Sequence, residues 1–170
     1  MFITDKDVIV DFLTGKTPDY RKRYYKDIVG CDDEAMECCH DQVQWMWPLH
    51  EESNFASTYP IVTKEVIEEA KKNPEVVNNL IKAKNRMESF FAIGPYTDIQ
   101  KQRKWCRPGN HNLLRITRII RSLRLFGLDK EAEDFYLKAV QAASRFLNDN
   151  DATFEYWKKA MRGEPWETLR

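Results

Sequence analysis

Apolar residues recur along much of this chain with the three- and four-residue spacing of amphipathic helices. The clearest case begins at Asn110 and ends at Gly127, where a rotation of about 100° per residue gathers apolar side chains on one face. No run alternates with a period of two for long enough to predict a sheet. We expect the apolar face of residues 110–127 to be core, and its members are Leu113, Ile116, Ile119, Ile120, Leu123 and Phe126.

Residues that favour helix starts and ends bound the other periodic segments. Expected starts include Thr4-Asp5, Asp32 or Asp33, Thr63, Asp129 and Asp151. The segments 48–62 and 95–109 carry Pro, Gly or small polar residues, so both are predicted loops. We therefore predict an all-α fold, a single compact multi-helix domain over residues 1–170. Its eight expected helices cover residues 5–13, 19–29, 34–47, 64–72, 74–93, 110–127, 129–147 and 151–162.

Composition limits the class of protein. The chain has 170 residues, of which 42% are hydrophobic and 12% aromatic, which is too apolar for a disordered chain and sufficient for one core. No apolar run approaches the roughly 20 residues of a membrane span, so we expect no membrane association. Met1-Phe2-Ile3 leads directly into charged residues rather than a signal-peptide core. A cytoplasmic location is the expectation.

Four cysteines occur, at positions 31, 38, 39 and 106. Without a secretory signal, reduced thiols are expected rather than disulfides. A zinc site that combines Cys38, Cys39 and Cys106 with His40 and His111 is an alternative, but the chain lacks a paired C-x-x-C spacing. We expect neither a metal nor a cofactor.

The formal net charge is zero, yet the charges are segregated. Residues 27–62 contain eight acids and no Lys or Arg, whereas residues 99–128 contain eight bases and no acid. The two blocks could neutralise each other in the fold, or part of the basic block could hold an anion. Because the chain is not basic overall, we do not expect it to bind nucleic acid.

The helix predicted at 110–127 carries a polar stripe beside its core face. His111, Arg115, Arg118 and Ser122 lie at i, i+4, i+7 and i+11. Amide groups at a helix start and arginine forks beside them suit a phosphate or a carboxylate. The alternative is that Arg115 and Arg118 pair with acids such as Glu37 or Asp41.

The helix predicted at 34–47 has polar residues at its edge as well. His40 and Gln44 lie four residues apart, and Trp45 points away from the apolar arc, either into a packing niche or toward a partner. An imidazole and an amide can together orient a ligand. No Ser-His-Asp spacing, phosphate loop, G-x-G-x-x-G or H-E-x-x-H motif occurs, so catalytic residues stay unknown, with His40 and His111 as the candidates.

Two long motifs in these helices resemble a known family. Residues 40–49 read H-D-Q-V-Q-W-M-W-P-L, and residues 111–123 read H-N-L-L-R-I-T-R-I-I-R-S-L. Both are similar to signatures of the opioid growth factor receptor conserved region, and a tryptophan shortly before the second motif, here Trp105, fits the same pattern. The resemblance covers a core of about residues 34–162 and implies a helical domain. Named eukaryotic members bind an enkephalin peptide and carry long additional segments, so hormone binding is not expected to transfer.

The resemblance draws attention to polar motif positions, because charged and amide groups are harder to explain by packing than Leu or Ile. We expect the two motif helices to meet and to bind a small anionic ligand, a nucleotide or a phosphorylated metabolite. One alternative is an enzyme that acts on a phosphate-bearing substrate with a histidine acid or base. Another is a protein-interaction module in which the arginines are structural and Trp45 or the 48–62 loop contacts a protein partner. The expected ligand-binding residues are His40, Gln44, Trp45, His111, Asn112, Arg115 and Arg118.

Overall fold

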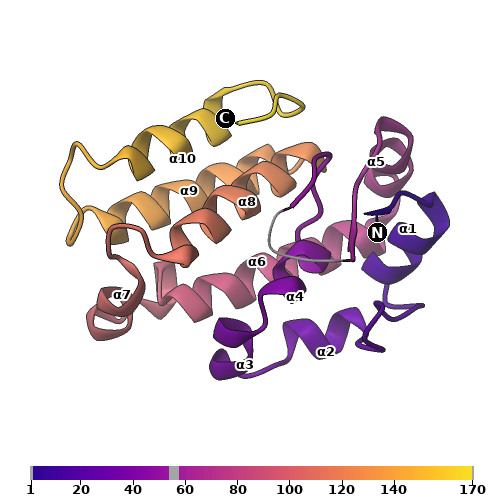
Figure 1. Ribbon diagram of the computed structural model, residues 1–170, viewed down its shortest axis with the longest axis horizontal. Coiled ribbons are helices and arrows are strands. Elements are labelled where there is room, and N and C mark those ends of the chain that lie inside the picture. The colour runs from indigo at the N-terminus through magenta and orange to yellow at the C-terminus, as the bar shows by residue number, and fades with distance from the viewer. Residues whose placement is uncertain (1, 54–57, 170) are drawn as a thin grey trace. The chain divides into compact units, whose positions relative to one another are not determined.

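A computed structural model describes residues 2–53 and 58–169 of the chain. Contacts group the chain into two compact units, Met1–Ala83 (unit 1) and Lys84–Arg170 (unit 2), and helix α6 (Pro74–Phe91) belongs to both. Within the described residues there are ten α-helices, eight of them seven residues or longer, which confirms the all-α class (Figure 1). That the chain forms a single domain stays a prediction. None of the described helices is both long and apolar enough to cross a bilayer.

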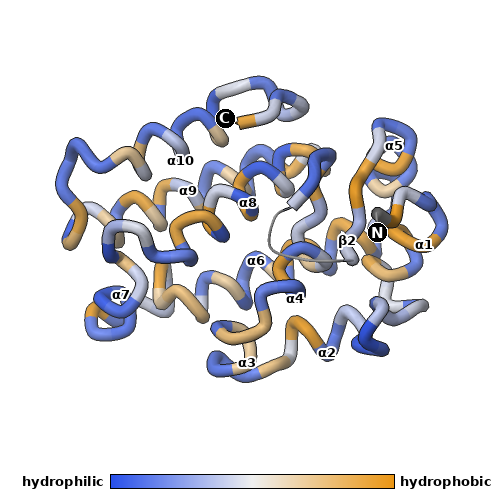
Figure 2. The backbone as a smooth tube through the Cα atoms, in the orientation of Figure 1, coloured by the Kyte–Doolittle hydropathy of each residue, from blue (hydrophilic) through white to orange (hydrophobic). Residues whose placement is uncertain are grey.

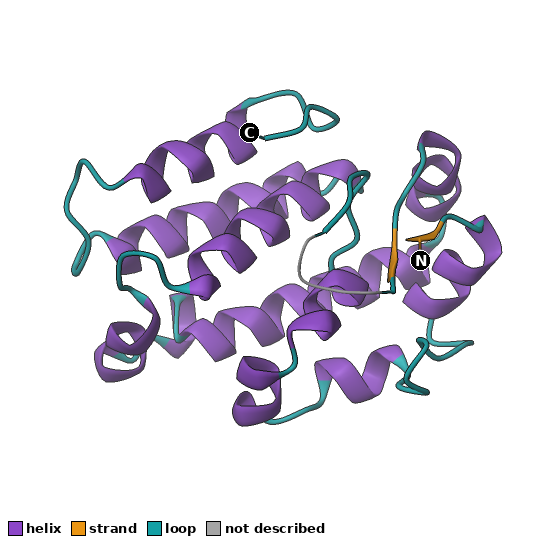
Figure 3. Ribbon diagram, in the orientation of Figure 1, coloured by secondary structure: helices purple, strands orange, loops and turns teal. Residues whose placement is uncertain are grey.

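Unit 1 is built from short helices and two very short strands. Strands β1 (Phe2–Ile3) and β2 (Tyr59–Pro60) pair in parallel, as Figure 3 shows, and α1 packs on α5 while α4 packs on α2 and β2. The strands are too short to be predicted from a period-two pattern. The helices of unit 1 before α6 are α1 (Lys6–Leu13), α2 (Tyr25–Val29), α3 (Asp33–Cys38), α4 (His40–Met46) and α5 (Lys64–Lys71).

Unit 2 contains three long helices that pack against one another. Helices α8 (His111–Leu125), α9 (Asp129–Ala143) and α10 (Ala152–Arg162) follow the 3₁₀ turn η1 (Gly94–Tyr96) and α7 (Ile99–Trp105). Hydrophobic and hydrophilic stretches alternate along their backbones (Figure 2), and every residue of the predicted core face of α8 is buried. The Trp157 indole of α10 donates to the Leu113 carbonyl of α8 at 3.0 Å, which satisfies a buried donor.

Side-chain caps explain where most of these helices begin. Asp5, Thr63 and Asp151 occupy N-cap positions and accept backbone N–H groups of the first turn, as their sequence positions predict, and Asn110 does the same for α8. The prediction that Asp129 caps α9 is wrong. Asp129 is the first residue of the helix, where its negative charge favours the helix dipole instead.

The helix predicted at 19–29 is wrong in its first half, because α2 begins only at Tyr25. The carboxylate of Asp19 accepts the backbone N–H groups of Arg21 and Arg23, both at 2.9 Å. Lys22 between them has a φ of +64°, a left-handed conformation that no α-helix contains. An aspartate side chain has thus replaced helical hydrogen bonds with a local turn.

The helix predicted at 34–47 is interrupted at Cys39, whose φ of −95° and ψ of 88° lie outside the helical region. The predicted helix is therefore two helices, α3 and α4, and a helical spacing of side chains does not continue from one into the other.

The loop predicted at 95–109 is also wrong, because it contains η1 and α7. Asp98 caps α7 by accepting the N–H groups of Gln100 and Lys101. Buried hydrogen bonds from Gln102 to the Ala92 carbonyl and from Trp105 to the Phe91 carbonyl fix the helix against the end of α6.

Candidate anion-binding residues on the motif helices

Helix α8 brings four of the expected ligand-binding residues together within two turns. Asn112 and Arg115 are buried, and His111 and Arg118 are half-buried. Arg115 is only 6% exposed, and its guanidinium donates to the Asn112 side-chain oxygen at 3.2 Å. Because buried polar groups are costly to maintain, this stripe is not an ordinary solvated helix face.

The later arginines of α8 have a structural role. Arg124 donates to the carbonyls of Ala160 and Gly163 at 2.8 and 2.6 Å, and so caps the C-terminus of α10. Arg121 is buried and donates to the Glu167 carbonyl at 3.2 Å. Half of the arginines on α8 are therefore accounted for by holding the C-terminal segment of unit 2.

Helix α4 carries the remaining expected residues, and it is buried on all sides from Asp41 to Met46. His40, its first residue, is exposed, whereas Gln44 is buried and donates to the Ser53 hydroxyl at 3.1 Å. Trp45 is 1% exposed; its indole donates to the Thr58 carbonyl at 3.1 Å, and its ring contacts Phe12 and Tyr20. Of the two interpretations of Trp45, the packing niche fits this burial.

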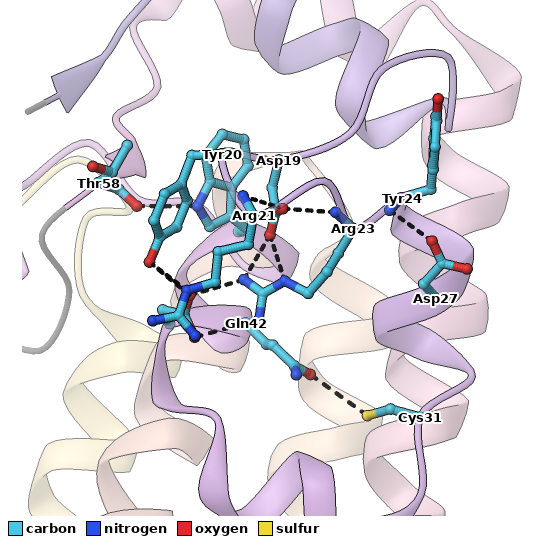
Figure 4. A network of polar contacts seen from close by, with 11 residues as sticks. Asp19, Tyr20, Arg21, Arg23, Tyr24, Asp27, Cys31, Gln42 and Thr58 are labelled. Atoms are coloured by element: carbon cyan, nitrogen blue, oxygen red, sulfur yellow. Dashed lines mark hydrogen bonds and ion pairs between the residues drawn. The ribbon is translucent and has the colours of Figure 1, made fainter.

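A charged network that the sequence did not predict holds α4 within unit 1 (Figure 4). Asp41 accepts the Tyr20 hydroxyl at 2.9 Å and the Arg23 guanidinium at 2.8 Å, and Arg21 lies 3.3 Å away. Arg23 also donates to Asp19 at 2.8 Å, so one guanidinium joins two buried carboxylates. Asp41 is one of the acids that the alternative interpretation pairs with Arg115 and Arg118; within its own unit it pairs with Arg21 and Arg23.

The electrostatics of Asp41 follow from these contacts. Burial alone would raise the pKa of Asp41, but hydrogen bonds from Arg23 and Tyr20 outweigh it and lower the pKa. Asp41 is therefore a fixed anion at neutral pH whose negative charge is neutralised by its own unit. Asp41 lies inside the first motif, and that position could have drawn attention to it. Its partners lie before α2, and no spacing of residues in the sequence links them to Asp41.

The cysteines are free thiols with different environments. Cys38 is exposed, Cys39 is half-buried, and burial raises the pKa of the Cys106 thiol to about 12. Among residues 2–53 and 58–169, no group of three or more His, Cys, Asp and Glu side chains is placed to hold a metal ion.

Comparison with known proteins identifies relatives that align with most of this chain. The chain is 30% identical over 146 residues to mouse opioid growth factor receptor-like protein 1, an alignment that covers 77% of this chain and 31% of the relative. It is 31% identical over 142 residues to the human opioid growth factor receptor, covering 76% of this chain and 21% of that protein. The chain thus spans less than a third of the length of these relatives. No solved structure gave a significant match.

The family model described as the opioid growth factor receptor conserved region matches residues 21–165. The match begins before the core expected from the two motifs, and it includes Arg21 and Arg23 of the network around Asp41. It covers α2 through α10, and so both motif helices. The chain belongs to the opioid growth factor receptor conserved-region family.

Proposed function

We propose that the chain binds a small anionic ligand, such as a nucleotide or a phosphorylated metabolite, through the polar positions at the start of α8. These are His111, Asn112, Arg115 and Arg118; a contribution of His40 and Gln44 on α4 is a separate part of the proposal, with its own test. Trp45 supports α4 from within the core. The observation that carries the proposal is the buried pair of Arg115 and Asn112 at the start of α8.

The pair supports anion binding because it fixes a guanidinium before any ligand arrives. An arginine held by an amide loses little conformational freedom on binding, and its planar fork matches phosphate and carboxylate oxygens. Arg118 lies on the same stripe one turn further along, and the N–H groups of the first turn add positive potential at the same end. Arg121 and Arg124 hold the C-terminal segment of unit 2 through the carbonyls of Glu167, Ala160 and Gly163, and we do not include them in the proposed site.

A thermal-shift screen tests the proposal with inorganic phosphate, nucleoside mono-, di- and triphosphates, and dicarboxylates as probes. A ligand at 100 times its Kd stabilises the folded chain by about 2.7 kcal/mol. For a chain of this size, that raises Tm by roughly 5–10 °C. Arg115→Gln and Arg118→Gln should each weaken binding by about tenfold or more, because a charge-assisted hydrogen bond contributes roughly 1.5–3 kcal/mol.

The matched control is Arg124→Gln, which removes a cation from the same helix. This change should lower the Tm of the free protein by releasing the end of α10, but it should leave the ligand-induced increase in Tm intact. His40→Ala and Gln44→Ala test separately whether α4 contributes to the same ligand. Absence of a shift with every probe, or equal shifts in wild type and Arg118→Gln, would overturn the proposal.

A further inference from the structure

A compact basic surface lies on α7 and the segments beside it, outside the proposed anion site. We call it the α7 surface and define it by five exposed cations. Four come from α7 and the turn after it, and the fifth follows α9. They are Lys101, Arg103, Lys104, Arg107 and Arg145.

The opposite face of α7 holds these cations in place. Gln102 and Trp105 are buried, and their side chains donate to the last carbonyls of α6 at 2.7 and 2.9 Å. The Gln102 oxygen in turn accepts the Arg145 guanidinium at 3.0 Å, which positions the fifth cation beside the helix. The cations therefore project from a backbone that is fixed on its inner side.

The charges of the α7 surface have no carboxylate partners in the described part of unit 2. Within residues 84–169, no carboxylate lies within ion-pairing distance of Lys101, Arg103, Lys104, Arg107 or Arg145. Some other exposed cations of unit 2 do have such partners: Arg162 forms a double hydrogen bond with Glu133, and Lys158 lies 3.9 Å from Glu155. Five unneutralised cations on one short helix and its neighbour repel one another, a cost that an acidic partner would remove.

Two apolar side chains lie at the start of the same segment. Tyr96 in η1 and Ile99 in α7 are each 47% exposed. The Arg103 guanidinium lies over the Phe146 ring, 5.8 Å from its centre. Charged donors beside exposed aromatic and aliphatic groups are typical of protein interfaces, in which an apolar anchor is surrounded by ion pairs.

We propose that the α7 surface docks an acidic segment of a partner protein, with Asp and Glu side chains on the cations and an apolar residue against Tyr96 and Ile99. Three of the five cations are arginines, whose forks match carboxylates. Nucleic acid is less well matched, because the chain has a net charge of zero and therefore lacks the long-range attraction that phosphate backbones require. The proposal does not depend on the arginines of α8.

Fluorescence anisotropy with a labelled synthetic peptide tests this directly. The probe is a short Asp- and Glu-rich peptide with one central Phe, compared with the same peptide in which every acid is the corresponding amide. Wild type should bind the acidic peptide at least tenfold more tightly, and the affinity should fall as salt is raised. Lys101→Glu/Lys104→Glu should lose at least tenfold in affinity and most of that salt dependence.

The matched control is Lys130→Glu/Lys159→Glu, which makes the same change in net charge at two exposed lysines elsewhere in unit 2. It should bind within twofold of wild type, and circular dichroism should confirm that all variants are folded. Equal binding of the acidic and amide peptides, or equal losses in the two double variants, would overturn the proposal. Tighter binding of a single-stranded oligonucleotide of matched charge would do so as well, in favour of nucleic acid.

Discussion

Each unit contains a buried ionic network, and the two differ in the kind of cation at the centre. In unit 1 the Arg23 guanidinium joins Asp19 and Asp41, both of which are buried. In unit 2 the ammonium of Lys84, which is 4% exposed, pairs with Glu88, Glu131 and Asp134, and Lys138 pairs with two of the same carboxylates.

The two cations differ in the geometry of their hydrogen-bond donors. A guanidinium offers donors in a fixed plane, so Arg23 sets the geometry of the turn before α2 as well as its charge. An ammonium is a compact charge with rotatable donors, and the carboxylates around Lys84 include Asp134, whose side chain is 46% exposed. Unit 1 should therefore be sensitive to donor geometry, and unit 2 to the presence of the charge.

The largest expected effect comes from removing the centre in unit 2. Lys84→Met keeps the volume of the side chain but leaves the buried Glu88 with Lys138 as its remaining partner. Breaking a buried ion pair costs about 3–5 kcal/mol, so urea unfolding at neutral pH should show a loss of about 4 kcal/mol. Lys130→Met, an exposed lysine at the start of α9, is the control and should change stability by less than about 0.5 kcal/mol. A loss of unfolding free energy below about 1 kcal/mol in Lys84→Met would show that the network does not stabilise the chain.

Conservative replacement of the bridging arginine in unit 1 comes next. Arg23→Lys keeps the charge but cannot donate to Asp19 and Asp41 in the same plane, so a loss of about 2–3 kcal/mol is expected. Arg21→Lys is the control, because its side chain is largely exposed and its exposed ion pair contributes about 0.5 kcal/mol. Equal losses in the two variants, again by urea unfolding, would show that charge alone matters in unit 1.

The pH dependence of stability should report on the titrating groups of the networks. The pKa of Asp41 in the folded chain lies below its unfolded value of about 3.9, so its stabilisation is present above that value and is lost as pH falls through the folded pKa. Asp41→Asn should therefore flatten the acid limb of the stability curve.

Lys84 should act at the opposite end of the pH range. Burial would lower the pKa of Lys84, but the carboxylates of Asp134 and Glu88 outweigh it and raise the pKa. Its contribution is present below the unfolded value of about 10.4 and is lost as pH rises through the folded pKa. Lys84→Met should accordingly flatten the alkaline limb.

For Asp41, an acid limb that is unchanged in Asp41→Asn would contradict the assignment for unit 1.

The smallest effect concerns the backbone of the turn that carries Arg23. Lys22 is exposed and has a φ of +64°, which a glycine adopts with less strain. Lys22→Gly should stabilise the chain by about 0.5 kcal/mol, because relief of the strain is partly offset by the greater freedom of glycine in the unfolded chain. Lys26→Gly, in the interior of α2, should instead destabilise it by about 1 kcal/mol. Thermal unfolding should reveal the opposite signs; a destabilised Lys22→Gly would mean that the lysine side chain has a role of its own.

The elements that were predicted correctly are those whose own residues carry the signal, as an apolar helical spacing or a capping side chain. Helix α8 has both an apolar face and a capping asparagine, and Asp151 and Thr63 mark the starts of α10 and α5. Helix α7 escaped prediction because it has little apolar periodicity. It is held by hydrogen bonds from Gln102 and Trp105 to the end of α6, and such contacts between elements leave no mark on the spacing of residues.

The candidate site was predictable on α8 and much less so on α4. The stripe of His111, Arg115 and Arg118 follows directly from helical spacing, and its partial burial supports its selection. On α4 the same reasoning gave weight to Trp45, which is core, and overlooked Asp41, whose partners Tyr20 and Arg23 come from a turn that was expected to be helix. Whether α4 and α8 act on one ligand stays a prediction.

The most direct test of the central claim is mass spectrometry of small molecules that remain bound through purification, performed in parallel on wild type and Arg115→Gln/Arg118→Gln. We expect an anionic molecule that is enriched in the wild-type protein, lost from the double variant and retained by Arg124→Gln. The same molecules at the same occupancy in wild type and in the double variant would contradict the claim that these arginines hold an anion.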